Sequence, residues 1–340
     1  MTENKPKIVI TNWIHDDILA EIEEFAVCIA NRDRTTPWSR EDILERGADA
    51  DGLLAFMTDM VDEALLREMP NLKTVSCAVR GYDNFDIDAC VRRDVTVAHV
   101  PDLLQGPTAD LTLGAIIALT RHMLPADRYV RSGNFEGWRP HFYGLGLAGT
   151  PVGIVGMGGL GRAIAKRLFA CEANVIFHDR QVDRVRIDPW GTFEGISLDE
   201  LLSESRIVIL ALPLVQETHH LIDRDAIAKM QPGTYLINPA RGSVADELAI
   251  GEALKSGRLA GYAADVFAME DWRLPNRPRS IPRDLLDATD RTVFTPHLGS
   301  AVDEVRRDIT KAAAYHLAQF FRGETPDGAI GQAATSAEAV

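Results

Sequence analysis

The chain has 340 residues, which suits two domains better than one compact core. It carries 36 Lys and Arg against 50 Asp and Glu, a formal net charge of -14, and this acidic balance opposes a nucleic-acid-binding role. No apolar run approaches the ~18 residues of a membrane span, no signal region opens the chain, and the four cysteines lack C-x-x-C spacing. We therefore expect a cytoplasmic protein with reduced thiols, no metal site, and no nucleic-acid or membrane partner. A small anionic substrate stays open, provided that a few arginines concentrate positive charge locally.

The first part of the chain alternates short β-rich runs with amphipathic stretches. The runs predicted to be strands are residues 8–11, 27–30, 52–56, 74–78 and 95–100. The stretches predicted to be helices are residues 17–25, 40–46, 62–69 and 87–92. Such alternation is typical of an open, mainly parallel sheet with helices on both faces.

A second α/β series follows one long predicted helix, residues 107–131, in which Pro107 is tolerated in the first turn. Its predicted strands are residues 152–155, 175–178, 207–212, 234–238, 261–265 and 293–294. Residues 301–321 predict a last helix that returns to pack against the first domain. We assign residues 1–103 and 299–322 to a substrate-binding domain and residues 104–298 to the second domain. The tail, residues 323–340, is predicted to have no fixed structure.

A glycine-rich motif opens the second series. Residues 156–161, Gly-Met-Gly-Gly-Leu-Gly, match G-x-G-x-x-G between an apolar strand and a helix, and Asp179 ends the next strand 18 residues after Gly161. Glycines alone also serve ordinary turns, but dinucleotide binding needs this order. Gly156 permits the tight turn, Gly158 lets the backbone approach the pyrophosphate, and Gly161 allows helix and sheet to pack closely.

The same motif predicts the cofactor. The helix N-terminus attracts phosphates, and Asp179 accepts hydrogen bonds from the ribose hydroxyls. The neighbouring Arg180 is either a solvated side chain or a partner for a 2′-phosphate, so NAD is expected with some NADP use left open. The expected fold class is α/β with two doubly wound parallel-sheet domains, a flavodoxin-like substrate domain and a Rossmann NAD domain.

Three further segments follow predicted strands of the second domain, where this fold places its active site. They contain Arg241 in Asn-Pro-Ala-Arg-Gly-Ser, Glu270 in Met-Glu-Asp-Trp, and His297 in Thr-Pro-His-Leu-Gly-Ser. Each residue taken singly could be an ordinary loop residue. Together, in one Rossmann domain, they predict a guanidinium that binds an anion and an imidazole whose tautomer is set by a carboxylate.

With these motifs, the sequence resembles the D-2-hydroxyacid dehydrogenases over nearly its whole length. The resemblance implies that Arg241 binds the substrate, that Glu270 supports His297, and that His297 exchanges the proton. It also implies a homodimer, for which the predicted helix 107–131 is the candidate interface. The cofactor contacts that it implies, besides those named above, are Thr108, Gly159, Leu160, Leu212, Pro213, Ala240, Arg241, Asp265, His297 and Gly299.

Within this family the sequence is most similar to the members that oxidise phosphite, the phosphonate dehydrogenases. Several stretches carry the similarity: residues 55–57, 81–86, 100–104, 137–144, 261–267 and 269–272. The resemblance implies a phosphite site that contains Arg80, Gly81, Met57, Leu104, Trp138, Tyr143, Ser300 and Arg306. Arg80 stands where those enzymes have lysine, so a planar guanidinium replaces the compact ammonium group.

Several alternatives stay open at this stage. Met57, Leu104, Trp138 and Tyr143 are explained equally well by core packing, and Arg306 by an exposed helix position. Reduction of a 2-keto acid such as glyoxylate or hydroxypyruvate would use the same Arg, Glu and His. An NAD(H)-sensing corepressor is a third reading, which the intact Arg, Glu and His oppose.

Overall fold

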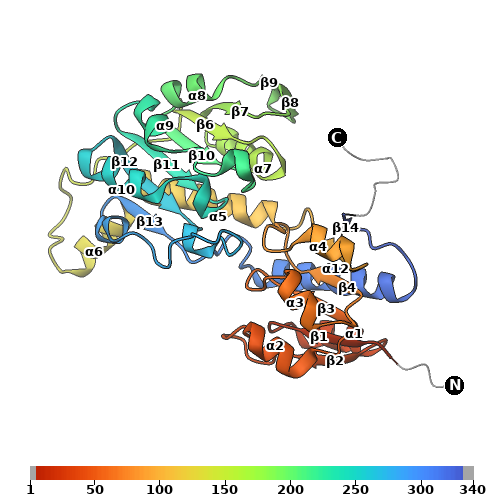
Figure 1. Ribbon diagram of the computed structural model, residues 1–340. Coiled ribbons are helices and arrows are strands. Elements are labelled where there is room, and N and C mark those ends of the chain that lie inside the picture. Colours follow the sequence, from red (N-terminus) through yellow and green to blue (C-terminus); the bar gives the residue numbers. More distant parts are fainter. Residues whose placement is uncertain (1–4, 332–340) are drawn as a thin grey trace. The chain divides into compact units, whose positions relative to one another are not determined.

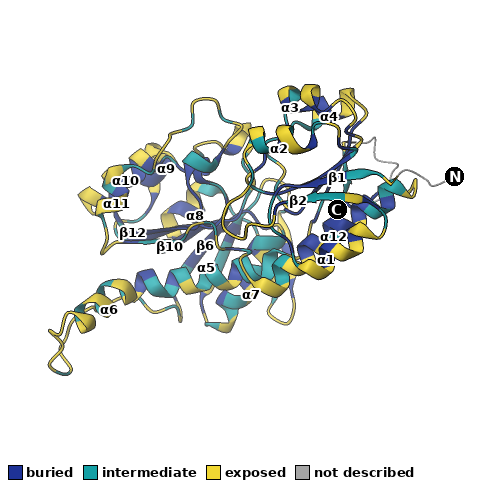
Figure 2. Ribbon diagram, turned by 90° about the horizontal axis from the view of Figure 1, so that it is seen from below, coloured by how far each residue is buried: buried dark blue, intermediate teal, exposed yellow. Residues whose placement is uncertain are grey.

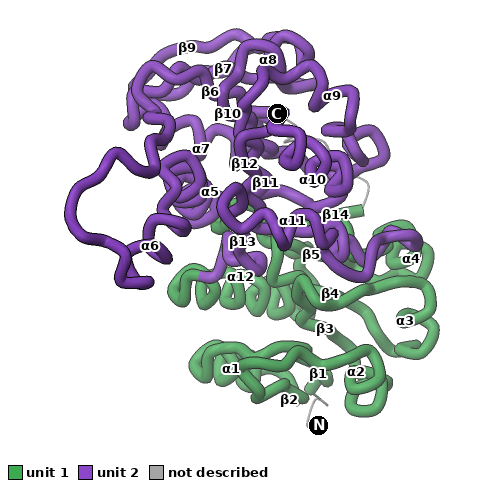
Figure 3. Tube along the Cα trace, turned by 90° about the vertical axis from the view of Figure 1, so that its left-hand side faces the viewer, with its two compact units in different colours: residues 1–104, 302–340 green, residues 105–301 purple. Residues whose placement is uncertain are grey.

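The computed structural model describes residues 5–331, and within them the chain divides into two compact units (Figure 1; Figure 3). Unit 1 contains the described residues up to Leu104 and from Val302 onward, and unit 2 contains Gln105–Ala301. The first observed boundary between the units thus lies one residue after the predicted one, and the second lies three residues after the predicted one. None of the helices in residues 5–331 is long and apolar enough to cross a membrane.

Unit 1 is built around a six-stranded sheet with the order β14-β5-β4-β3-β1-β2. The strands are β1 (Lys7–Ile10), β2 (Val27–Ala30), β3 (Gly52–Ala55), β4 (Thr74–Cys77), β5 (Thr96–His99) and β14 (Ala329–Ile330). All pairs are parallel except that of β14 with β5. The helices are α1 (Asp16–Glu23), α2 (Arg40–Gly47), α3 (Glu63–Glu68), α4 (Ile87–Arg92) and α12 (Asp303–Phe321).

The strands β1, β3, β4 and β5 of this sheet are largely buried, whereas the edge strand β2 is partly exposed (Figure 2). Because successive side chains of a strand point to opposite faces, Ile8 belongs to the same hydrophobic cluster as Leu317 of α12, and Val9 belongs to the same cluster as Leu65 of α3. The Ser76 hydroxyl donates a hydrogen bond to the Ala313 carbonyl of α12 at 2.8 Å. The last long helix therefore packs against the first sheet, as predicted from the sequence.

Unit 2 contains a second, fully parallel six-stranded sheet with the order β13-β12-β11-β10-β6-β7. Its strands are β6 (Pro151–Val155), β7 (Asn174–His178), β10 (Ile207–Leu210), β11 (Thr234–Asn238), β12 (Leu259–Ala264) and β13 (Thr292–Phe294). One face carries α5 (Gln105–Thr120) and α7 (Gly159–Ala170), and the other carries α8 (Leu198–Glu204), α9 (Arg224–Lys229) and α10 (Glu247–Ser256), with the short α11 (Arg283–Asp287) beside α10. The strand order reverses at β6, so a crevice for ligands is expected outside its carboxyl end.

The prediction of one helix over residues 107–131 is wrong. The structure has α5, which ends at Thr120, and a separate α6 (Met123–Arg131). Between them His122 adopts a left-handed conformation with φ 53°, and the Thr120 carbonyl accepts a hydrogen bond from Leu145 N–H. Pro125, which lacks an N–H, lies in the first turn of α6, where no helical hydrogen bond is lost.

The prediction of an unstructured tail is also wrong for residues 323–331. After a turn at Gly323, β14 pairs with β5, and His99 N–H donates to the Gly328 carbonyl at 2.9 Å. Two residues of strand are too short to carry an alternating pattern, so pairing in the folded chain decides this element. The rest of the predicted tail lies outside the described residues. A hairpin of β8 (Arg184–Ile187) and β9 (Gly191–Glu194) was likewise not predicted.

Candidate active site

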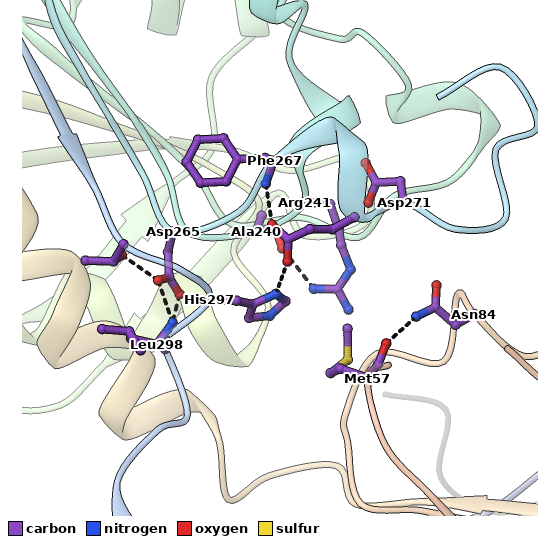
Figure 4. A network of polar contacts seen from close by, with 12 residues as sticks. Met57, Asn84, Ala240, Arg241, Asp265, Phe267, Asp271, His297 and Leu298 are labelled. Atoms are coloured by element: carbon purple, nitrogen blue, oxygen red, sulfur yellow. Dashed lines mark hydrogen bonds and ion pairs between the residues drawn. The ribbon is translucent and has the colours of Figure 1, made fainter. Parts of the chain in front are cut away.

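Three neighbouring strands of unit 2 bring the predicted catalytic residues to one edge of the sheet. Arg241 follows β11, Glu270 follows β12, and His297 follows β13. Because β11, β12 and β13 are adjacent and parallel, their carboxyl ends lie at the same edge. Figure 4 shows this region from close by.

His297 and Glu270 form a direct pair. The Nδ1 atom of His297 lies 2.8 Å from Oε2 of Glu270, and the other oxygen of Glu270 accepts the Phe267 N–H at 2.7 Å (Figure 4). An ionised Glu270 therefore accepts a hydrogen bond from the Nδ1–H of His297 and leaves Nε2 as the ring nitrogen that can exchange a proton with a substrate. His297 has φ 57°, an uncommon conformation for a residue with a side chain, which marks the site as locally strained.

Asp265 holds the loop that carries His297. One carboxylate oxygen accepts from the Thr295 hydroxyl at 2.5 Å and from Leu298 N–H at 2.7 Å, and the other accepts from Gly299 N–H at 2.8 Å. The His297 N–H also donates to the Asp265 carbonyl at 2.8 Å. The structure thus gives Asp265, which the resemblance assigned to the cofactor, a clear role in shaping the His297 loop.

The Arg241 loop is held by a residue that the sequence analysis missed. The Asn238 side chain is fully buried, donates from Nδ2 to the Arg241 carbonyl at 2.8 Å, and accepts the Ala240 N–H at 3.1 Å. The Arg241 guanidinium donates to the Ala240 carbonyl at 2.9 Å. An asparagine that ends a buried strand was the available signal, because it must find partners for a buried amide.

The glycine-rich segment has the geometry expected of a dinucleotide site. Gly156 has φ 99°, and a Cβ on Gly161 would lie 2.1 Å from the Gly156 carbonyl oxygen. A Cβ on Gly158 would meet no atom within 4 Å, so its backbone is open to a ligand at the start of α7. These residues fit a bound NAD, whose pyrophosphate the free N–H groups at this helix end would hold.

The remaining predicted cofactor residues surround this segment within unit 2. Thr108 on α5 lies beside Gly299, since a Cβ on Gly299 would be 3.0 Å from its hydroxyl. Leu212 and Pro213 follow β10, the Leu212 Cβ lying beside Gly156, and Arg180 is exposed beside Asp179. Gly159 and Leu160 are half-buried in the first turn of α7, and Ala240 is buried.

Asp179 also holds the glycine-rich loop. One oxygen accepts the Met157 N–H at 2.6 Å, and the other accepts from Gln181 and Val182. We expect Asp179→Ala to shift coenzyme preference toward NADP by ~1–3 kcal/mol, because a 2′-phosphate is no longer repelled and a ribose contact is lost. The measurement is kcat/KM with NAD and with NADP.

The matched variant for this experiment is Asp179→Asn, which keeps one oxygen for the Met157 N–H and removes only the charge. It should shift the preference in the same direction with less loss of overall coenzyme affinity. A wild-type enzyme that already prefers NADP contradicts the role given to Asp179.

Within unit 1, predicted substrate residues follow neighbouring strand ends. Met57 follows β3, and its carbonyl accepts the Asn84 side-chain N–H at 2.9 Å (Figure 4). Arg80 and Gly81 follow β4, and Leu104 follows β5 at the end of the first stretch of unit 1. Arg306 is half-buried on α12 with its guanidinium 5.8 Å from the centre of the Phe56 ring, so the alternative of an exposed helix arginine is wrong.

His99 is a second residue that the sequence analysis missed. Its Nδ1 atom donates to the Arg80 carbonyl at 2.9 Å, and its ring stacks edge-on against Tyr82. Burial, more than any other influence, lowers the pKa of His99, so the ring stays neutral at physiological pH. It thereby fixes the backbone from which the Arg80 side chain extends.

Trp138 and Tyr143 lie in the loop after α6, with exposed fractions of 77% and 75%. Core packing is therefore not their role in the single chain. Ser300 lies half-buried just before the chain leaves unit 2.

Comparison with known proteins places this site in a family. The family model for the NAD binding domain of D-isomer specific 2-hydroxyacid dehydrogenases matches residues 113–299. The chain is 36% identical over 330 residues to a glyoxylate reductase of Thermofilum pendens, covering 96% of this chain and 94% of that protein. It is 35% identical over 328 residues to a glyoxylate reductase of Pyrococcus furiosus, covering 95% and 94%. The solved structure of the TT0316 protein of Thermus thermophilus aligns with a TM-score of 0.85 at 32% identity, covering 96% of this chain and all of that one, 100%.

Proposed function

The chain belongs to the D-isomer specific 2-hydroxyacid dehydrogenase family, and we propose that it is an NAD-dependent reductase of small 2-oxo acids such as glyoxylate and hydroxypyruvate. The observation that carries this proposal is the hydrogen-bonded His297–Glu270 pair. His297 follows β13 and Glu270 follows β12, and Arg241 follows β11, the next strand of the sheet. The curated relatives named above, both glyoxylate reductases, support the substrate class. The resemblance to phosphite-oxidising members seen in the sequence supports a second candidate function.

Arg241, Glu270 and His297 have separate roles in the reduction of a 2-oxo acid. The Arg241 guanidinium binds the substrate carboxylate through two parallel hydrogen bonds, which also orients the neighbouring carbonyl. The cofactor, when bound, supplies the hydride that reduces the carbonyl carbon. His297, protonated and oriented by Glu270, donates its Nε2 proton to the carbonyl oxygen, so that a 2-hydroxy acid is formed. In the reverse direction neutral His297 accepts the hydroxyl proton.

Phosphite oxidation is the second candidate, and Arg80 is the observation that favours it. A second permanent cation after β4 suits a compact dianion better than a monoanionic 2-oxo acid. The Glu270-Asp271-Trp272 segment also lacks the proline that many hydroxyacid enzymes have after the catalytic glutamate. In this reaction water attacks phosphorus as the hydride leaves for the nicotinamide, and His297 accepts the water proton.

One experiment separates the candidates. The purified protein is given NADH with glyoxylate or hydroxypyruvate, and separately NAD with phosphite, and absorbance of NADH is followed. Loss of NADH with the 2-oxo acids, and none formed from phosphite, supports the first proposal. Rapid NADH formation from phosphite replaces it by the second. Tight NADH binding without turnover of any of these substrates would favour a sensor and overturn both.

Arg80 provides a further prediction. Arg80→Ala should raise KM for an anionic substrate by ten- to a hundred-fold, roughly the loss of one charge-assisted hydrogen bond, with a smaller effect on kcat. Arg80→Lys keeps the charge and should stay active. The control is Arg92→Ala, which removes an exposed arginine that pairs with Glu63 in the same unit. An unchanged KM in Arg80→Ala would show that this cation does not bind substrate.

The homodimer implied by the resemblance stays a prediction, and α6 supports it. None of the side chains of α6 is buried, and Met123, Leu124 and Val130 are exposed apolar residues on it. The following loop adds exposed Phe135 and Trp138. Figure 2 draws most of α6 in the colour of exposed residues. Apolar side chains gathered on one exposed segment are typical of a surface that a partner covers.

A further inference from the structure

Two short loops carry the proposed active-site residues, and they pack directly against each other. The 3-10 turn η2 (Gly242–Val244) follows Arg241, and the 3-10 turn η3 (Ala268–Glu270) ends with Glu270. At Gly242 there is no room for a side chain, because a Cβ would lie 1.9 Å from the Phe267 carbonyl carbon and 2.0 Å from the Ala268 nitrogen. The backbones of the two loops are therefore in contact at this point.

Two buried carboxylates link the loops in opposite directions. Glu247, at the start of α10 after η2, accepts the Ala268 N–H of η3 at 2.8 Å. Asp271, directly after η3, accepts the Ser243 N–H of η2 at 2.7 Å. Each loop thus supplies an acid that binds a main-chain N–H of the other. Glu247 and Asp271 are only 5% and 3% exposed, so water does not compete for these hydrogen bonds.

We propose that Glu247 and Asp271 are positioning residues that clamp the Arg241 loop to the Glu270 loop, so that the anion-binding guanidinium and the His297–Glu270 pair keep one mutual geometry. This inference rests on the proposed function for the roles of Arg241, Glu270 and His297. It adds two residues that act through the loops that they join.

Glu247 differs from Asp271 in one respect: its second oxygen, Oε2, is buried without a hydrogen-bond partner in residues 5–331. Burial first, and then the charges of Asp271, Glu270 and Asp246, raise the pKa of Glu247 to about 7. Burial first, and then the charge of Glu247, raise the pKa of the fully buried Tyr262 hydroxyl on β12. The Glu247 carboxyl therefore gains its negative charge near neutral pH, in a region that already contains Glu270.

The negative charge of ionised Glu247 should affect the His297–Glu270 pair electrostatically. As pH rises through about 7, ionised Glu247 adds negative charge close to Glu270 and favours the protonated form of His297. Glu247→Gln keeps an amide oxygen for the Ala268 N–H but cannot ionise. Glu247→Ala removes the acceptor and leaves a buried N–H without its partner.

The test compares these two variants with Glu252→Ala, an exposed position on the same helix whose side chain pairs with Arg224. We expect Glu247→Ala to lower kcat/KM by roughly ten- to a hundred-fold, because the two loops lose their mutual position, while NADH binding measured by fluorescence is kept. Glu247→Gln should stay within a few-fold of wild type at pH 6 and shift the alkaline limb of kcat/KM to lower pH. Glu252→Ala should match wild type throughout.

A second measurement does not depend on any substrate. In the folded protein the pKa of Glu247 is raised from 4.5 to about 7, so its ionisation penalises the folded state increasingly as pH rises from 5 to 8. The thermal unfolding midpoint of Glu247→Gln should therefore rise relative to wild type over this range. This rise in the unfolding midpoint is expected even if the proposed function is wrong, because it does not depend on any substrate. A pH-independent difference in midpoint, or a Glu247→Ala variant with normal kcat/KM and an unshifted pH profile, would overturn the clamp.

Discussion

Replacing His297 by alanine is expected to lower kcat by about two to four orders of magnitude, the usual contribution of a positioned acid or base. NADH binding should be nearly unchanged, because the ring pairs with Glu270 and its task is proton transfer. Steady-state kinetics together with NADH fluorescence titration measure both effects. The result follows from the 2.8 Å contact between Nδ1 and Glu270, which reserves Nε2 for the substrate.

A second histidine–carboxylate pair serves as the control. His15 lies 3.3 Å from Asp303 in unit 1, and His15→Ala should retain wild-type kcat. Glu270→Gln should be milder than His297→Ala and should shift the pH profile to lower pH, because the carboxylate stabilises the imidazolium. Near-normal turnover in His297→Ala would rule out the proposed proton donor.

The second large effect is expected at Gly242. Gly242→Ala places a methyl group 1.9 Å from the Phe267 carbonyl carbon, so the Arg241 and Glu270 loops must separate. Overpacking of this kind should lower stability by ~1–3 kcal/mol. A displacement of about 1 Å in a catalytic group can cost roughly a hundred-fold, so kcat/KM should fall by that order. The thermal unfolding midpoint and kcat/KM are the two measurements.

Gly114→Ala is the matched control, because a Cβ on Gly114 in α5 would meet no atom within 4 Å. Alanine favours a helix over glycine by roughly 0.5–1 kcal/mol, so this variant should be neutral or slightly stabilised. Equal behaviour of the two variants would mean that the loops tolerate separation, and it would contradict this prediction.

Local patterns in the sequence were enough to predict the two α/β series and the edge of the sheet at which the site lies. Buried parallel strands have continuous apolar runs, such as Ile207–Leu210 and residues 235–237 of β11, and their pattern is local. Glycine spacing and the position of Asp179 are also local features, because the fold requires them within one strand–helix–strand unit. Arg241, Glu270 and His297 could be predicted because each lies in the short segment that follows one of the strands. The substrate could not be identified from these residues, since the same three side chains suit both a 2-oxo acid and phosphite.

Features that depend on partners far away in the sequence could be seen only in the folded structure. The helix break at His122 coincides with the Thr120 carbonyl accepting the Leu145 N–H, and β14 forms because β5 offers a free edge. In the same way Asn238, His99 and Glu247 look like ordinary polar residues until folding buries them. Whether a carboxylate is solvated or clamps two loops depends on which backbone N–H groups surround it, and residues far apart in sequence supply those groups.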